Sequence, residues 1–268
     1  MPEPQPGINL SRRKLRSLIG GRDSRYSWLE LLTPDMVVWE DDFMGDTLHG
    51  GYQSTAGAGA GALAAALVAG QLGGMVRLVT GTAGDSTARS DLSLGIHFRA
   101  DMGPVFLCRL QMSAITGVKV EVGFTDVVSG TDAGAVNVKA TPTFTAADAA
   151  LWALDTNDNT DWEGLGVDSG TAAVTQEAAI APVAATYETL VVALREYNST
   201  DRLAAATYLR FNADGNQTYP GGNGAPVWQS LAVSSDVLLT PWIYAEARNT
   251  TSKNVDIDFI KVWQRRVA

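Results

Sequence analysis

From residue 36 onward, apolar positions alternate with polar positions at a spacing of two, the pattern of a strand with one buried face. Segment 117–126 shows it most clearly, because four apolar residues alternate there with polar residues or glycine: Val118, Val120, Val122 and Phe124. The same alternation recurs over residues 91–100, 105–113, 187–198, 203–215, 238–249 and 255–264. Many such strands with almost no helical pattern between them predict an all-β fold, an antiparallel two-sheet sandwich.

The N-terminal segment has a different pattern and predicts an extended arm over residues 1–36, ahead of a single sandwich domain over residues 37–268. Leu15, Leu18 and Ile19 share one face at helical spacing. Ser11 offers a helix cap and Gly20 ends the turn, so a short helix is expected inside the arm. A helix this short is not stable alone and needs a surface to dock against.

Charge is segregated between the arm and the body. The chain has a net charge of −9, yet its first 26 residues hold six basic side chains: Arg12, Arg13, Lys14, Arg16, Arg22 and Arg25. The acidic body argues against a nucleic-acid partner, because phosphate binding needs a basic surface. Packaged DNA is an alternative acceptor for the arm, ranked below a protein surface.

We interpret the arm as a tether that orders on docking to a partner, with arginines that steer the encounter. Its expected apolar anchors are Leu15, Leu18, Ile19, Trp28, Leu29 and Leu32. Its expected charged contacts are Arg12, Arg13, Lys14, Arg16 and Arg22. A basic tail without a partner is the alternative, because chain termini are often disordered.

The composition suits a globular protein with a large core, at 46% hydrophobic and 18% charged residues. Cys108 is the only cysteine, so the chain forms no internal disulfide, which fits folding in a reducing cytosol. The first residues lack the charged start and apolar run of a secretory signal. The uncharged stretch 56–74 is rich in Gly and Ala, which predicts a loop followed by a short buried strand rather than a membrane span.

Six segments, taken in order, resemble the concanavalin A-like or laminin G-like jelly roll in the form found in tailed-bacteriophage structural proteins. They are WEDDFMGDTL (39–48), GGMVRLVTGT (73–82), FLCRLQMSAITGVKVEVGFTD (106–126), ALWALDTNDNTDWEGLGVDSG (150–170), YLRFNADG (208–215) and TPWIYAEARNTTSKNVDIDFIKVWQ (240–264). The resemblance spans about residues 37–264 and implies a jelly-roll sandwich. Because this fold hosts lectins, glycoside hydrolases and structural modules, function depends on individual residues.

The residues argue against catalysis. In retaining glycosidases of this fold, the resemblance implies a strand with the motif Glu-x-Asp-x-Glu, which supplies two converging carboxylates. This sequence lacks that motif. Glu121 and Asp126 are five residues apart, so a regular strand directs them to opposite faces, where we expect solvated polar positions. His97 lies on the polar side of its segment and Cys108 among apolar residues, so no nucleophilic triad is expected.

Residues 155–163 are the segment most similar to a cation-binding loop. Oxygen-bearing side chains alternate there, and the candidate ligands are Asp155, Asn157, Asn159 and Asp161. The EF-hand pattern fails, because Thr160 and Gly166 take the positions of its glycine and glutamate. A Ca²⁺ site of another design and a polar surface loop both remain open.

Two aromatic residues in loop regions are candidates for a sugar platform, since pyranose rings stack on exposed aromatic faces. Trp162 follows the Asp/Asn loop, and Tyr219 lies in a Gly/Pro-rich segment.

Together these patterns favour a non-enzymatic bacteriophage virion protein, a capsid decoration or minor head protein held by its arm. Its expected partners are the major capsid or tail protein and further copies of itself, with no resident cofactor and no membrane contact. The first alternative is a tail-associated protein that binds a receptor or a host-surface glycan. The second is a cellular lectin or an inactive relative of the glycosidases.

Overall fold

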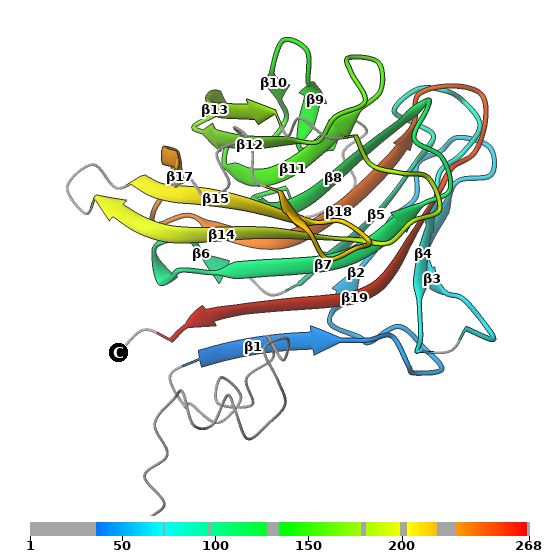
Figure 1. Cartoon of the computed structure of the whole chain (residues 1–268), viewed down its shortest axis with the longest axis horizontal. Coiled ribbons are helices and arrows are strands. Elements are labelled where there is room, and N and C mark those ends of the chain that lie inside the picture. Colours follow the sequence, from blue (N-terminus) through cyan, green and yellow to red (C-terminus); the bar gives the residue numbers. More distant parts are fainter. Residues whose placement is uncertain are drawn as a thin grey trace, which may run out of the picture.

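The protein is described by a computed structural model that covers residues 36–71, 73–95, 98–127, 134–177, 181–198, 203–218 and 229–266. Its strands form two antiparallel sheets packed face to face (Figure 1), which confirms the predicted all-β sandwich. Residues 1–35 of the expected arm, which include its short helix, lie outside these residues.

The first sheet has the order β16-β15-β14-β7-β19-β4-β3, with β1 also paired to β19 and β17 to β15. Its strands are β1 (Met36–Asp41), β3 (Leu63–Leu67), β4 (Val76–Val79), β7 (Val105–Met112), β14 (Glu188–Asn198), β15 (Leu203–Phe211), β16 (Gln217–Thr218), β17 (Gln229–Ser234) and β19 (Asn254–Arg265). We call it sheet A. Strand β19 is its long central strand, because it pairs with β7 on one side and with β4 and β1 on the other.

The second sheet, sheet B, has the order β13-β12-β11-β8-β18-β5-β2, with β6 also paired to β18. Its strands are β2 (Tyr52–Gln53), β5 (Arg89–Leu94), β6 (Phe98–Arg99), β8 (Val118–Thr125), β11 (Ala149–Asp155), β12 (Glu163–Asp168), β13 (Thr171–Glu177) and β18 (Leu238–Ala247). A short 3₁₀ turn, η1 (Ala100–Met102), leads into β7. Strands β9 (Val136–Val138) and β10 (Thr143–Phe144) form a separate small hairpin above sheet B (Figure 1).

The core lies between the two sheets and follows the predicted alternation. Val118, Val120, Val122 and Phe124 of β8 point into it, opposite Phe106 and Leu110 of β7. Cys108 is fully buried among them, and burial raises the pKa of its thiol, so the core position predicted for this residue is confirmed. Burial of each large apolar side chain of this core contributes about 1.5–3 kcal/mol to the stability of the fold.

Large buried aromatic side chains join the two sheets through hydrogen bonds. The Trp152 indole donates a hydrogen bond to the Val191 carbonyl (3.1 Å), and the Tyr208 hydroxyl donates to the Leu165 carbonyl (2.6 Å). Gly164 makes room for the Tyr208 ring, because a Cβ atom at this position would lie 2.6 Å from Cδ2. The core is therefore filled by rings whose polar atoms are satisfied.

The Gly/Ala-rich stretch differs from its prediction. It contains β3, which is an edge strand of sheet A rather than a buried strand, and its first residue, Leu63, is 58% exposed. The buried strand comes later, as β4, where Val76 and Leu78 face the core. None of the described residues forms a helix long and apolar enough to cross a membrane.

Candidate functional site

The outer face of sheet B carries a row of charged and aromatic side chains, because the alternate positions of its strands point away from the core. They are Arg89 and Asp91 of β5, Lys119 and Glu121 of β8, and Trp242, Tyr244 and Glu246 of β18. All are buried. The solvated positions expected around Glu121 are therefore a wrong prediction.

Segment 134–146, which contains the β9–β10 hairpin, covers this face. The backbone N–H groups of Ala135 and Val136 donate to the Glu121 carboxylate (2.8 and 3.0 Å), and Lys119 Nζ donates to the Val136 carbonyl. The Trp242 indole donates to the same carboxylate (3.1 Å). Glu121 is thus engaged by the chain itself on several sides, as a structural anion rather than as an open catalytic group.

The other charges on this face are paired with one another. Lys119 Nζ lies 3.0 Å from Glu121 and 3.8 Å from Glu246. Arg248 binds Glu246 (2.7 Å) and Asp155 (2.5 Å). Burial raises the pKa of the Glu246 carboxyl, an effect that Lys119 and Arg248 partly offset. Such a network is costly to break, because removal of one member leaves an unpaired charge in a dry site.

Asp126 follows β8 and takes no part in this network. Its backbone N–H donates to the Asp148 carbonyl (3.0 Å), and its Oδ1 is buried with no hydrogen-bond partner. Burial raises the pKa of this carboxyl, and hydrogen bonds from nearby backbone groups, including that of Asp148, partly offset the rise.

The expected cation loop is organised around side-chain cations of the chain. Lys139 Nζ lies 2.6 Å from Asn159 Oδ1, 3.1 Å from the Asp161 carbonyl, 3.4 Å from Asp158 and 3.7 Å from Glu163. Asp155 instead binds Arg248, and its Oδ1 also accepts the backbone N–H of Asn157 (3.1 Å). The four candidate ligands do not converge on one point, and no group of three or more His, Cys, Asp or Glu among the described residues is placed to hold a metal ion.

Trp162 is fully buried, so the sugar platform expected at this residue is a wrong prediction. Its ring packs edge-to-face on Trp152, with centroids 6.5 Å apart, and its indole donates to Glu188 (2.9 Å). Glu188 also binds Arg210, and burial nevertheless raises the pKa of its carboxyl. Tyr219 lies outside the described residues.

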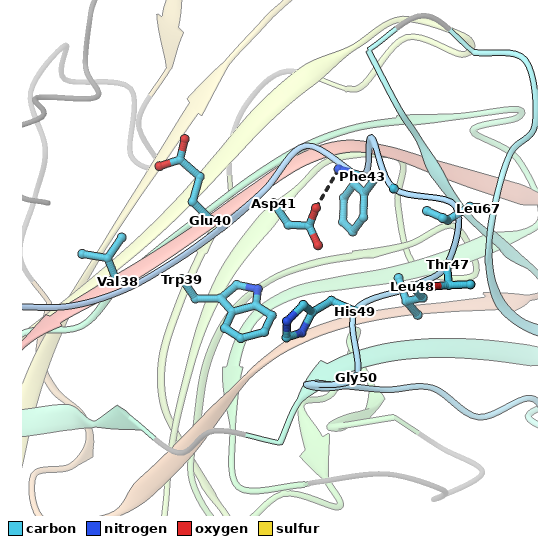
Figure 2. A pocket seen from close by; sticks show the side chains of 11 residues that line it. Val38, Trp39, Glu40, Asp41, Phe43, Thr47, Leu48, His49, Gly50 and Leu67 are labelled. Carbon is cyan, nitrogen blue, oxygen red and sulfur yellow. Dashed lines mark hydrogen bonds between the residues drawn. The ribbon is translucent and has the colours of Figure 1, made fainter.

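An open cavity of about 550 Å³ lies beside β1, and we name it the Trp39 pocket. Figure 2 shows its lining residues, which are Val38, Trp39, Glu40, Asp41, Phe43, Gly45, Thr47, Leu48, His49, Gly50 and Leu67. Strand β1 forms one wall, because its antiparallel register with β19 fixes its backbone from Met36 to Asp41. The loop over residues 45–50 forms the facing wall.

Two rings define the centre of the Trp39 pocket. The Trp39 indole and the exposed His49 imidazole pack edge-to-face, with centroids 4.6 Å apart and planes at 81°. Trp39 is held from behind by Tyr52, to whose hydroxyl the indole donates (3.1 Å). His49 is held by its own turn, because Nδ1 accepts the Gly51 N–H (3.0 Å). Both rings are therefore fixed before any ligand arrives.

The Tyr52 hydroxyl behind Trp39 is a neutral partner. Burial raises its pKa well above the usual range, the Trp39 hydrogen bond lowers it, and the charge of Asp41 raises it. A glycine is required at position 51 beside the Trp39 ring, because a Cβ atom on Gly51 would lie 2.6 Å from Trp39 Cη2. This close approach sets the position of the indole.

Asp41 is positioned by a strained turn. Its Oδ1 accepts the Phe43 N–H (2.7 Å), and Phe43 has a φ of +57°, which is uncommon for a residue with a side chain. Gly74 packs under this turn, where a Cβ atom would lie 2.3 Å from the Asp42 carbonyl oxygen. Figure 2 shows the Asp41 carboxylate and the Phe43 ring on the side of β1 that carries Trp39, while Glu40 points the other way.

Sequence reasoning missed this pocket. Residues 39–48 suggested only an opening strand, although a tryptophan, four acidic residues and one of the two histidines of the chain fall within eleven positions (39–49). That density was the available signal. The contributions of Leu67 and Tyr52, by contrast, depend on pairing in the fold.

The predictions that concern a partner remain untested by the structure. All of the expected arm anchors, from Arg12 to Leu32, lie outside the described residues, as does His97. The capsid or tail partner, self-association and the virion location therefore stay predictions from sequence.

Comparison with known proteins shows the fold. No family model matches the sequence, and no curated protein matches it. Among solved structures, the Ca²⁺-bound exoplasmic/lumenal domain of VIP36 aligns with a TM-score of 0.53 at 12% identity, over 86% of this chain and 91% of that one. The legume lectin-like domain from Entamoeba histolytica aligns at 0.51 and 6% identity, over 81% and 91%.

A third structure is LamA from Z. galactanivorans in complex with laminaritriose and laminaritetraose. It aligns with a TM-score of 0.52 at 10% identity, over 86% of this chain and 99% of that one. The chain thus has the concanavalin A/legume lectin-like jelly-roll fold. The structural neighbours include a carbohydrate recognition domain, a legume lectin-like domain and a pseudo β-1,3-glucanase, so the fold alone does not decide between binding and hydrolysis. Nothing among them supports a bacteriophage origin.

Proposed function

We propose that the protein binds a glycan in the Trp39 pocket and does not hydrolyse it. The observation that carries the proposal is the pair formed by the part-exposed Trp39 indole and the exposed His49 imidazole, which are fixed around an open cavity of about 550 Å³. A cavity of this size suits a ligand of one to three sugar rings.

The chemistry of the walls fits a carbohydrate. Aromatic faces pack against the apolar C–H face of a pyranose, while carboxylate and hydroxyl groups bind its hydroxyls. The Trp39 pocket offers an indole and an imidazole for the first task, and Asp41 and Thr47 for the second. The rings are held by Tyr52 and by the Gly51 backbone, so little side-chain freedom is lost on binding.

The covered outer face of sheet B supports binding without hydrolysis. Hydrolysis by two carboxylates requires both groups to reach the same glycosidic bond. Glu121 is instead bound by Ala135, Val136 and Trp242, and Glu246 by Lys119 and Arg248.

The experiment is a glycan array probed with the full chain, followed by calorimetry on the strongest ligand. Trp39→Ala and His49→Ala should each weaken binding by about tenfold or more, because each removes a stacking surface. His49 is exposed, so this variant remains informative if Trp39→Ala unfolds the protein. Tyr187→Ala is the matched control, since this ring lines a different cavity.

Two results would overturn the proposal. One is array binding that His49→Ala and Trp39→Ala leave unchanged, and the other is no binding to any glycan. Release of sugar from a β-glucan by the wild-type protein would show that the non-hydrolytic part is wrong.

A further inference from the structure

Of the residues that line the Trp39 pocket, Glu40 and Asp41 are acidic and none is a lysine or arginine. Segment 36–53, which supplies most of its walls, contains four carboxylates and no lysine or arginine: Glu40, Asp41, Asp42 and Asp46. Glu40, Asp42 and Asp46 are exposed, whereas Asp41 is half-buried at the pocket.

Of the basic residues paired with β1, Lys261 neutralises Glu40 and Arg265 lies far from Asp41. Lys261 is bound to Glu40 (2.9 Å) and is only 1% exposed, and Glu40 points away from the rings. Arg265 lies opposite Met36, at the other end of β1. Five residues of strand separate that end from Asp41, a distance of roughly 16 Å that exceeds a Debye length at physiological salt. The pocket therefore presents the Asp41 carboxylate on the side of the rings, with no lysine or arginine among its lining residues.

The molecule combines an aromatic ring with a carboxylate to hold a cation in at least three places, of which Lys261 with Trp263 and Glu40 is one. Lys119 Nζ lies 5.2 Å from the centre of the Tyr244 ring, beside Glu121 and Glu246. Arg109 lies 4.2 Å from the centre of the Tyr187 ring and binds Asp258. In the Trp39 pocket, the ring and the carboxylate of Asp41 are both present and face a cavity.

We infer that the Trp39 pocket selects a glycan bearing a protonated amino group, an amino sugar that is not N-acetylated. This inference rests on the proposed function and specifies its ligand. The ammonium would lie between the Trp39 indole and the Asp41 carboxylate, where a cation–π contact and a charge-assisted hydrogen bond act together. Sialylated or uronic glycans, by contrast, would bring a carboxylate toward a charge of the same sign.

The test compares oligosaccharides that differ only at C2. Calorimetry at pH 6, where the amine is protonated, uses β-1,4-linked tetramers of glucose, N-acetylglucosamine and glucosamine, together with galactose and galactosamine oligomers. We expect the amino form to bind at least about tenfold more tightly than its neutral counterpart, with a preference that falls as salt is raised.

Asp41→Asn should remove this preference, so that the amino and neutral oligomers bind the variant with affinities within a factor of about two or three of each other. Asn keeps the oxygen that accepts the Phe43 N–H, so the turn is preserved. The control is Asp214→Asn, which removes the same charge from an exposed residue at another cavity and should preserve the preference.

The outcomes separate this inference from the proposed function. Equal or tighter binding of the neutral or N-acetylated oligomers overturns the amino-sugar inference and leaves glycan binding intact. The same holds if none of these oligomers binds but the array returns a Trp39-dependent neutral or acidic glycan. Absence of binding throughout overturns both.

Discussion

Lys139 Nζ lies 2.6 Å from Asn159 Oδ1, inside the loop whose oxygen atoms suggested a cation site in the sequence. The side chain of Lys139 is fully buried, so its ammonium has exchanged water for these oxygens. The loop is therefore held by a positive charge that belongs to the chain.

Lys139→Met is expected to lower the free energy of unfolding by about 2 kcal/mol, because it leaves Glu163 and Asp158 without their cation in a mostly dry site. Urea unfolding followed by fluorescence measures this. Addition of millimolar Ca²⁺ should not shift the melting temperature of the wild-type protein. A Ca²⁺-induced rise of several degrees would instead favour a metal site in this loop.

Glu121→Gln tests the covered face of sheet B. The substitution takes the negative charge from Lys119 and weakens the contacts with Ala135 and Val136, so we expect a loss of about 2–4 kcal/mol in unfolding free energy. Asp85→Asn, in an exposed turn, is the control and should change stability little. If Glu121→Gln were as stable as the wild type, this carboxylate would not be the structural anion described above.

Gly51 and Gly50 provide a matched pair for the Trp39 pocket. Gly51→Ala places a methyl group against Trp39 and should displace the indole, with a stability loss of about 1–3 kcal/mol and weaker glycan binding. Gly50→Ala meets no atom within 4 Å and should leave both properties nearly unchanged. Equal affinities for the two variants would show that the position of the indole does not matter for the ligand.

The partly buried carboxyl of Asp126 should make the stability of the protein depend on pH. Its folded-state pKa is raised by burial, so its contribution to stability is present at acidic pH and is lost as the pH rises through that value. Asp126→Asn should therefore stabilise the protein at pH 7, by less than about 1 kcal/mol because the group is only partly buried. The gain should shrink toward pH 4. Unfolding curves at both pH values decide this, and a gain that is equal at the two would contradict it.

The strands were predictable because alternation is a local signal. Residues 105–113 and 117–126 match β7 and β8 almost to the residue, because the alternating apolar positions mark the buried face of each strand. The same signal cannot tell which segment covers the other face. Glu121 was misplaced for this reason, because its cover comes from residues 134–146.

The candidate site was missed for a related reason. Its rings come from β1 and from the turn after it, but Leu67 of β3 also lines the cavity and Tyr52 of β2 supports Trp39 from behind. The pairing of β1 with β19, of β3 with β4 and of β2 with β5 brings these parts together. Trp162 was misplaced in the opposite sense. Its loop-like sequence surroundings predicted an exposed ring, but the ring packs against Trp152 in the core.

The pairing of β1 with β19 places Met36 directly opposite Arg265, so the described body begins and ends on adjacent strands. Backbones in such a pair lie about 5 Å apart. A circular permutant could therefore join these two positions through a few residues and open the chain at an exposed turn elsewhere. It would also free the Trp39 pocket from whatever precedes residue 36, which gives a direct way to separate the properties of the sandwich from those of the basic segment.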